Sequence, residues 1–261
     1  DEAAIQAAFS GRDVLYDPKL VDDPARLAAS LREARALIVR NRTQVRGALL
    51  ASAVRLEVVG RLGVGLDNID VPACAARGIA VYPASGANDL SVAEYVITAA
   101  LMLLRRAWFA TARVAAGEWP RTESMGRELA GKRLGLVGYG AIARVTGRMA
   151  RDLGMSVGAY DPLLPGDHPA WAGALRQTLP DLLSASDVVS LHVPLTDATR
   201  NILDAAALAG MKPGAILINA ARGGVVDEAA LCASLRSGYL GGAALDVFAR
   251  DADGALYLAG R

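Results

Sequence analysis

Short apolar runs alternate with helix-forming segments along almost the whole of this 261-residue chain. The runs are rich in β-branched and aliphatic residues, which is typical of strands buried within a sheet. They lie at Ala36–Val39, Leu56–Val59, Ile79–Val81, Leu134–Val137, Ser156–Tyr160, Val188–Leu191, Ala215–Asn219 and Gly242–Asp246. Helical periodicity lies between them, as at Pro24–Ala34, Ala141–Leu153 and Glu228–Arg236, and the glycines placed for left-handed helix ends are Gly78, Gly154, Gly210 and Gly238. Strand, helix and strand in this order predict parallel sheets with crossover helices, which is an α/β fold.

Composition narrows the class of protein. Hydrophobic residues make up 53% of the chain, enough for a sizeable core, and 28 basic residues balance 27 acidic ones. This balance argues against a nucleic-acid-binding surface or a basic membrane patch, and the longest apolar run, Tyr95–Leu104, is too short to span a bilayer. The first residues do not resemble a signal peptide, and Cys74 and Cys232 form neither a metal-binding spacing nor a disulfide framework. We therefore expect a cytoplasmic protein without a metal site.

One helical segment differs from the others. Ser91-Val92-Ala93-Glu94 has the spacing of a capping box, and it opens an apolar run that continues to Leu104. A helix that is hydrophobic on nearly all faces must be buried, either between domains or at a subunit interface. The polar stretch Gly117–Gly131 then predicts a linker before the next sheet. We expect a hinge near residues 88–95, with one domain formed by residues 1–92 and a second by residues 93–261.

A glycine-rich turn joins the strand Leu134–Val137 to the helix that follows it. Its sequence is Gly138-Tyr139-Gly140-Ala141-Ile142-Ala143, which has the form G-x-G-x-x-A. Gly138 allows a tight turn, Gly140 allows the backbone to approach a pyrophosphate, and the small Ala143 allows close packing of helix on strand. Free N–H groups at the start of the helix bind the anion, so the motif predicts a dinucleotide site. The alternative is a glycine turn that binds nothing.

The next strand, Ser156–Tyr160, leads into Asp161, at about the distance from Gly138 that the dinucleotide motif requires. A carboxylate there accepts hydrogen bonds from the ribose hydroxyls of adenosine and repels a 2′-phosphate. No arginine follows Asp161 before Arg176. The sequence therefore favours NAD over NADP.

Three later strands also end in short segments with polar or small residues: His192-Val193-Pro194, Asn219-Ala220-Ala221-Arg222 and Asp246. Ligands of an open α/β sheet gather at the carboxyl ends of its strands, so we expect these segments beside the glycine turn. Arg222 offers a planar, permanently charged fork for a carboxylate or a polarised carbonyl. The alternative for Arg222 is a salt bridge to a nearby acid such as Asp227.

Together these segments resemble the D-isomer-specific 2-hydroxyacid dehydrogenase family, which includes D-lactate, glycerate and 3-phosphoglycerate dehydrogenases. The matching segments follow the family's order over nearly the whole chain: Gly63–Asp70, Ser91–Glu94, the Gly138 turn, His192–Thr196, Asn219–Asp227 and Ala244–Phe248. The resemblance implies two Rossmann-like domains with parallel doubly wound sheets around a central cleft. It also implies NAD as the cofactor, a small 2-hydroxy or 2-keto acid as the substrate, and a homodimer packed through the helix that starts at Ser91.

The resemblance further implies roles for individual residues. Val64 and Gly65 would present backbone N–H groups to the substrate carboxylate, and Arg222 would bind that carboxylate and the carbonyl oxygen. Asp246 would contact the nicotinamide carboxamide. The other cofactor-binding residues would be Gly138, Tyr139, Gly140, Ala141, Ile142, Asp161, His192, Val193, Pro194, Ala220 and Ala221. For His192, a structural place at a strand end is favoured over a role in proton transfer.

The match breaks after the Asp-Val-Phe motif. The family's catalytic glutamate position holds Asp251, which is one methylene shorter, and Ala252 replaces the following proline. The family's general acid/base histidine is absent, because the chain has only His192 and His168, the latter in an expected exposed turn. A missing general acid lowers the rate by about 10²–10⁴. Since the family's first strand and closing helix also lack counterparts, we expect that the C-terminal return segment of the first domain is missing from this sequence.

Arg40 follows the strand Ala36–Val39 in a loop that resembles the family's substrate loop. Phosphoglycerate dehydrogenases place an arginine there, near the substrate phosphate. The match predicts a substrate with a second anionic group, of the phosphoglycerate or sulfolactate kind, or a small polar acid such as glycerate; a solvated surface arginine is the alternative. Two other functions stay open at this point: a non-catalytic NAD(H)-binding sensor or corepressor-like protein, which the missing histidine favours, and a formate dehydrogenase, which nothing in the sequence favours.

Overall fold

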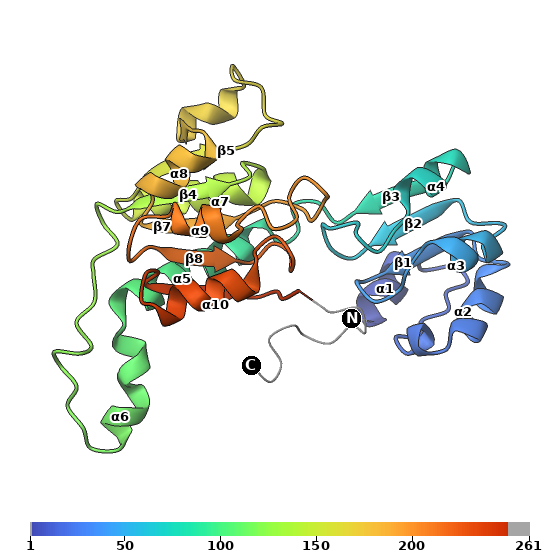
Figure 1. Ribbon diagram of the computed structural model, residues 1–261. Coiled ribbons are helices and arrows are strands. Elements are labelled where there is room, and N and C mark those ends of the chain that lie inside the picture. The colour runs from blue at the N-terminus through green and yellow to red at the C-terminus, as the bar shows by residue number, and fades with distance from the viewer. Residues whose placement is uncertain (1, 250–261) are drawn as a thin grey trace. The chain divides into compact units, whose positions relative to one another are not determined.

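The computed structural model describes residues 2–249 of the chain. The chain divides into two compact units between Ala87 and Asn88. The boundary expected at residues 92–93 falls inside the helix α5 (Asp89–Arg105). Each unit is built on a parallel sheet with helices between its strands, which confirms the α/β class (Figure 1).

The first unit contains a three-stranded parallel sheet whose strands follow the chain order: β1 (Ala36–Val39), β2 (Val58–Arg61) and β3 (Ala80–Pro83). Its helices are α1 (Glu2–Ala8), the short 3-10 helix η1 (Leu20–Asp22), α2 (Pro24–Leu31), α3 (Gly47–Ser52) and α4 (Val71–Ala76). Two of these helices start at a capping aspartate that is followed closely by proline. Asp23 accepts a hydrogen bond from the amide of Arg26, and Asp70 accepts one from the amide of Ala73.

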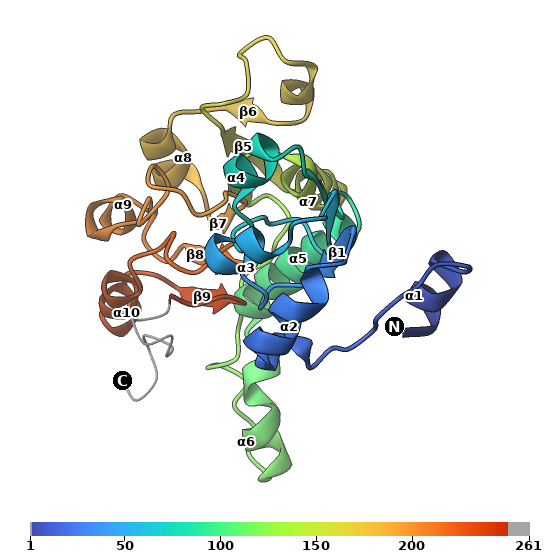
Figure 2. The ribbon, with the colours of Figure 1, turned by 90° about the vertical axis from the view of Figure 1, so that its right-hand side faces the viewer.

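The second unit contains a six-stranded parallel sheet in the order β6-β5-β4-β7-β8-β9, and Figure 2 shows β6, β5, β7, β8 and β9 following one another. The strands are β4 (Arg133–Val137), β5 (Ser156–Tyr160), β6 (Leu175–Arg176), β7 (Val188–Leu191), β8 (Ile216–Asn219) and β9 (Gly242–Leu245). Besides α5, the helical segments are η2 (Ala107–Ala110), α6 (Thr111–Ala115), α7 (Ala141–Asp152), η3 (Pro169–Gly173), α8 (Leu179–Ala185), α9 (Ala205–Ala209) and α10 (Glu228–Arg236). The order reverses at β4, so this sheet is doubly wound, with its switch point between β4 and β7.

Alternate residues of the second sheet feed two separate cores. Ile216 and Ile218 of β8 pack with residues of α5 and α7, whereas Leu217 packs with residues of α8, α9 and α10. Successive side chains of a strand point to opposite faces, so the continuous apolar run of β8 is buried on both sides. This two-sided burial holds the strand ends firmly, and the candidate site lies at those ends.

Two local predictions were wrong. Ser91 is not the N-cap of the apolar helix, because α5 begins at Asp89 with Asn88 as its N-cap, and Ser91 lies in the first turn. The side chain of Asn88 makes no capping hydrogen bond, but the acidic Asp89 in the first turn is stabilised by the helix dipole. Gly210 is not left-handed, since its φ is −80°, whereas Gly78, Gly154 and Gly238 have the expected positive φ.

The expected linker Gly117–Gly131 contains no helix or strand, but its second half packs against the core of the second unit, to which it belongs. Leu129 is buried in the core beside α5, and a Cβ on Gly126 would meet the backbone oxygens of Leu104 and Arg105. Within residues 2–249, no helix has both the length and the apolar character needed to cross a membrane. The same part of the chain has no cluster of His, Cys, Asp and Glu side chains suited to a metal ion.

Candidate dinucleotide and substrate site

The carboxyl ends of five neighbouring strands lie in one row in the second unit. Val137 is paired with both Tyr160 and Leu191, Leu191 is paired with Asn219, and Asn219 is paired with Leu245. Each of these is the last residue of its strand. The residues that follow are therefore adjacent along one edge of the sheet: Asp161, Gly138, His192, Ala220 and Asp246. The structure thus brings the strand-end residues predicted from the sequence together.

The glycine turn after β4 has the geometry that a pyrophosphate requires. Gly138 has φ +87°, and a Cβ there would lie 2.6 Å from the carbonyl oxygen of His192. Around Gly140 no atom lies within 4 Å of a Cβ position, so the backbone is open to an approaching phosphate. Ala143 is fully buried, as close packing of α7 on the sheet demands. The open turn and the N-terminus of α7 therefore fit a dinucleotide.

Arginines add positive charge beside this turn. A groove of about 370 Å³ runs from Tyr139 and Ala141 along one side of α7, and its lining includes Arg144, Arg148 and Arg151. Asp89 also lines the groove. Of the arginines, Arg144 lies within one turn of the N-terminus of α7, where its positive charge favours an anionic ligand.

Asp161 is oriented by backbone amides on both of its oxygens. Oδ2 accepts a hydrogen bond of 2.9 Å from the amide of Tyr139, and Oδ1 accepts from the amides of Leu163 and Leu164. The first bond ties the carboxylate to the glycine turn itself. The side chain of Tyr139 is in turn stacked on Trp171, with ring centroids 5.3 Å apart. The carboxylate is therefore fixed beside the turn before any ligand binds.

His192 lies at the end of β7, and its imidazole is held within the protein. Its Nε2 lies 3.0 Å from the hydroxyl of the fully buried Ser190. Burial lowers the pKa of His192 to about 4, so the ring is neutral at neutral pH. The following loop is closed by Thr199, whose hydroxyl donates to the carbonyl of Pro194. The imidazole is therefore neutral and lies in a partly buried position at the strand end.

A buried asparagine shapes the turn that carries Arg222. The Nδ2 of Asn219 donates to the carbonyl of Arg222 at 2.9 Å, and its Oδ1 accepts from the amide of Ala221 at 3.1 Å. The guanidinium of Arg222 donates to the carbonyl of Ala221 at 2.6 Å. Asp227, the alternative partner considered for Arg222, caps α10 by accepting from the amide of Ala230. No role of Asn219 was predicted, although an asparagine at the end of an apolar strand is a signal that could have indicated one.

The segment after β9 is anchored to the same edge. The amide of Asp246 donates to the carbonyl of Asn219, and the amide of Ala249 donates to Oε1 of Glu228 at 2.6 Å. Glu228 is buried, and its second oxygen has no hydrogen-bond partner within the described chain. Burial and the nearby Asp246 carboxylate raise the pKa of Tyr95, which places this α5 residue near the same segment. Neither Glu228 nor Tyr95 was predicted as part of the site.

The predicted substrate residues Arg40, Val64 and Gly65 all lie in the first unit, in loops that follow β1 and β2. The ends of these strands are neighbours, because Val39 is paired with Arg61 and the amide of Leu62 donates to the carbonyl of Val39. Asp251, the predicted catalytic carboxylate, lies outside the described residues. His168 caps η3, where its Nδ1 accepts from the amide of Ala170.

Comparison with known proteins identifies the family of the chain. The family model described as "D-isomer specific 2-hydroxyacid dehydrogenase, NAD binding domain" matches residues 97–254. An (S)-sulfolactate dehydrogenase of Chromohalobacter salexigens is 57% identical over 95% of this chain and 81% of its own length. A D-3-phosphoglycerate dehydrogenase of Mycobacterium leprae is 42% identical over 88% of this chain, which spans 44% of that protein.

Solved structures give the same result. A D-lactate dehydrogenase from Aquifex aeolicus, in complex with NAD and lactic acid, is similar with a TM-score of 0.78 and 33% identity, covering 85% of this chain and 66% of that one. A glyoxylate reductase from Paecilomyes thermophila has a TM-score of 0.81 and 30% identity, covering 95% of this chain and 77% of that one. None of these relatives favours the non-catalytic alternative. The chain therefore belongs to the D-isomer specific 2-hydroxyacid dehydrogenase family, and it is an NAD-dependent oxidoreductase of 2-hydroxy acids.

Proposed function

We propose that the protein interconverts a D-2-hydroxy acid that carries a second anionic group, of the sulfolactate kind, and its 2-keto acid. The observation that supports the chemistry best is the single row of strand ends, which joins the open glycine turn, the oriented Asp161 and the Arg222 turn. The proposed catalytic residues are Arg222 and Asp251. Proposed cofactor contacts come from the whole row: residues 138–142, Asp161, 192–194, Ala220, Ala221 and Asp246.

NAD, when bound, supplies or accepts the hydride. Asp161 accepts hydrogen bonds from the ribose hydroxyls, and Asp246 orients the carboxamide. Arg222 binds the substrate carboxylate and stabilises the negative charge that develops on the carbonyl oxygen, which is the kind of interaction that lowers an activation barrier most. Val64 and Gly65 donate backbone N–H groups to the carboxylate. His192, which is neutral at neutral pH, lines the pocket and transfers no proton.

The choice of substrate rests on Arg40 and on the name of one relative. Arg40 directly follows β1, at the carboxyl edge of the first sheet, where a guanidinium can meet a sulfonate or phosphate. The relative that is 57% identical is an (S)-sulfolactate dehydrogenase. Because the sulfonate-bearing carbon outranks the carboxylate in the priority rules, the S label corresponds to the arrangement that is called D in lactate. The label is therefore consistent with a D-specific family.

The substrate proposal is tested by replacing Arg40 with alanine. We expect the KM for doubly anionic 2-keto acids, such as sulfopyruvate and phosphohydroxypyruvate, to rise by about 10- to 100-fold, as the loss of a charge-assisted hydrogen bond would give. The KM for glyoxylate, which has no second anionic group, should change little. An equal rise for glyoxylate and for the doubly anionic acids would rule out this role of Arg40.

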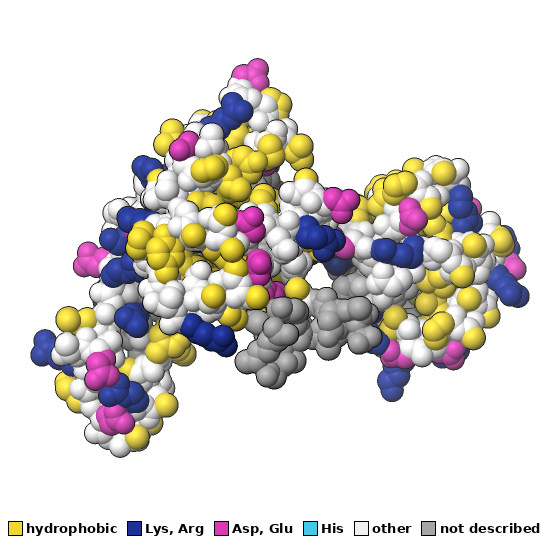
Figure 3. All heavy atoms as spheres, viewed as in Figure 1, with side chains coloured by type: hydrophobic (Ala, Val, Ile, Leu, Met, Phe, Trp, Pro, Cys, Tyr) yellow, Lys and Arg dark blue, Asp and Glu magenta, His cyan; other side chains and the backbone are white. Residues whose placement is uncertain are grey.

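The assembly proposed is a homodimer formed through α5 and the arm that follows it. Exposed apolar side chains are concentrated there, on Leu90, Tyr95, Leu101, Trp108, Phe109, Val114, Trp119 and Met125. In Figure 1 the arm that carries α6 extends away from the second sheet, and Figure 3 shows hydrophobic side chains among the charges on its surface. Exposed apolar patches of this kind mark protein–protein interfaces. The proposed compartment is the cytoplasm, which agrees with the free thiols of Cys74 and Cys232.

A further inference from the structure

Two loops of the first unit are joined by a buried asparagine. Asn68 lies in the segment Gly63–Asp70, and it is only 5% exposed. Its Nδ2 donates to the carbonyl of Arg40 at 2.9 Å and to the carbonyl of Thr43 at 2.7 Å. One side chain thus uses both of its N–H groups to hold the first and last residues of the loop 40–43.

Backbone hydrogen bonds hold Asn68 in the position from which its side-chain amide contacts the loop 40–43. The amide of Val45 donates to the carbonyl of Asn68 at 2.8 Å, and the amide of Asp70 donates back to the carbonyl of Val45 at 3.0 Å. The guanidinium of Arg46 also donates to the carbonyl of Asp67. Hydrogen bonds therefore hold the residues that follow the loop 40–43 against the Gly63–Asp70 segment. The side chain of Asn68 adds two hydrogen bonds to the loop itself.

The neighbouring residues Val64 and Gly65 are held in a different way. The amide of Gly63 donates to the carbonyl of Arg61, the amide of Ala84 donates to the carbonyl of Gly63, and the amide of Ile69 donates to the carbonyl of Leu66. None of these bonds involves the side chain of Asn68. A change in that side chain should release the Arg40 loop and leave the loop of Val64 and Gly65 in place.

We propose that Asn68 is a positioning residue for substrate specificity, which sets the conformation of the Arg40 loop and so the binding of the substrate's second anionic group. The inference rests on the proposed function for the role of Arg40. A primary amide suits this contact, because two carbonyl oxygens face it and its two N–H groups supply a donor to each. A carboxylate of the same shape would turn two attractive contacts into two repulsive ones.

The test is Asn68→Asp, with Asn201→Asp as the control, because Asn201 is exposed and lies in the second unit. We expect the KM of Asn68→Asp for sulfopyruvate to rise at least about tenfold, which corresponds to the loss of about one to two hydrogen bonds. The KM for glyoxylate should stay within about threefold, and the Kd for NADH should not change, since the cofactor residues lie in the second unit. Hydrogen–deuterium exchange over residues 40–46 should become faster, whereas exchange over β4 should not.

Equal changes in KM for both acids, or unchanged exchange over residues 40–46, would overturn the role of Asn68. If Asn68→Asp does not fold, Asn68→Ser keeps one short donor and is judged by the same two criteria. Wild-type protein that reduces no 2-keto acid would contradict the proposed function instead. In that case the exchange measurement still decides whether Asn68 holds the loop.

Discussion

Asp161 is the residue on which the choice of cofactor depends most directly. Its carboxylate is held by the amides of Tyr139, Leu163 and Leu164, so Asp161→Asn should keep the fold of the turn while removing the charge. We expect the Kd for NADH to rise by about 10- to 100-fold and the preference over NADPH to shrink, because a charge-assisted hydrogen bond is lost and the repulsion of a 2′-phosphate disappears. Fluorescence titration with NADH and with NADPH measures the two Kd values. Asp167→Asn, an exposed change in the same loop, is the control, and an unaltered NADH-to-NADPH ratio in Asp161→Asn would contradict the assignment.

His192 makes the stability of the protein depend on pH. The folded-state pKa of about 4 lies below the unfolded value of about 6.5, so the unfolded chain binds the proton more tightly. The stabilisation is therefore fully present above pH ~6.5 and is lost as the pH falls toward ~4, by about 3 kcal/mol in total. Urea unfolding across this range should show that His192→Gln has a shallower pH dependence than wild type. Parallel curves for the two proteins would mean that the imidazole is not kept neutral by burial.

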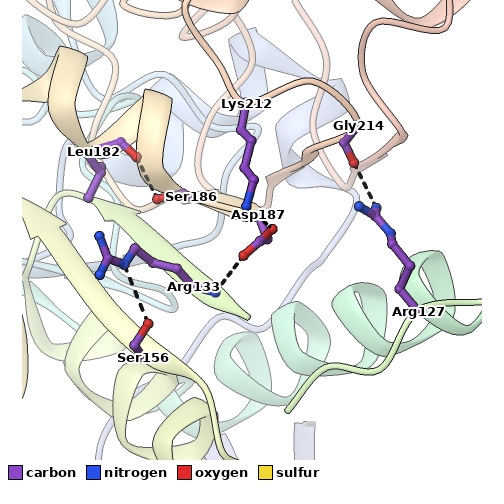
Figure 4. Close-up of polar contacts among 8 residues, drawn as sticks. All are labelled: Arg127, Arg133, Ser156, Leu182, Ser186, Asp187, Lys212 and Gly214. Atoms are coloured by element: carbon purple, nitrogen blue, oxygen red, sulfur yellow. Dashed lines mark hydrogen bonds and ion pairs between the residues drawn. The ribbon is translucent and has the colours of Figure 1, made fainter. Parts of the chain in front are cut away.

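Among the elements, the amino ends of β4, β7 and β8 are joined by polar contacts far from the carboxyl edge. The buried carboxylate of Asp187 accepts from the amide of Arg133 at 2.9 Å and from Nζ of Lys212 at 2.7 Å (Figure 4). The guanidinium of Arg127 donates to the carbonyl of Gly214 at 2.8 Å. Burial alone would raise the pKa of Asp187, but the bonds from Lys212 and Arg133 outweigh it and hold the pKa below its ordinary value.

Asp187→Ala should therefore lower the free energy of unfolding by about 2–3 kcal/mol, since it leaves the amide of Arg133 without its acceptor. Lys212→Met should cost only about 1 kcal/mol, because the lysine side chain is 47% exposed and its charge is screened by solvent. The contribution of Asp187 is present above pH ~4 and is lost as the carboxylate is protonated below it. Denaturant unfolding, with the exposed Asp152→Ala as a control, checks the order of these losses. A larger loss for Lys212→Met than for Asp187→Ala would contradict it.

The sequence correctly predicted those helices and strands whose position depends on the local pattern of apolar and polar residues. The short apolar runs predicted the bounds of β1, β5 and β7 without error, although only β7 is buried along its whole length. The two-residue strand β6 was missed, since Leu175–Arg176 is too short to have a pattern and exists only through its pairing with β5. The start of α5 was misplaced because two candidate N-caps, Asn88 and Ser91, lie within one turn of each other.

The residues of the candidate site also divide into those that the sequence could predict and those that it could not. Residues that directly follow a strand, such as Gly138 and Asp161, could be placed from the sequence because the parallel register brings all strand ends to one edge. Asn68, Asn219 and Glu228 could not, because each acts through a buried hydrogen bond to a loop that local pattern does not reveal. Glu228 contacts Ala249 across a long stretch of sequence, and no periodicity predicts such a partner.

At the scale of the whole molecule, the exposed apolar residues of α5 and its arm predict association. We expect the wild-type protein to have the mass of a dimer by light scattering. The double variant Leu101→Asp, Trp108→Glu should be a monomer, because two charges would be buried in the interface without partners. Val54→Asp alters an exposed apolar residue of the first unit and should remain a dimer. A monomeric wild-type protein would show that this surface has another use.

The reaction itself is tested most directly by following NADH oxidation with sulfopyruvate, in wild type and in Arg222→Lys. We expect NADH oxidation that requires the 2-keto acid. In Arg222→Lys, which replaces the fixed guanidinium fork, kcat/KM should fall about 10²–10³-fold while the Kd for NADH is unchanged. Tight NADH binding by the wild-type protein without oxidation by sulfopyruvate, phosphohydroxypyruvate or glyoxylate would contradict the proposed function.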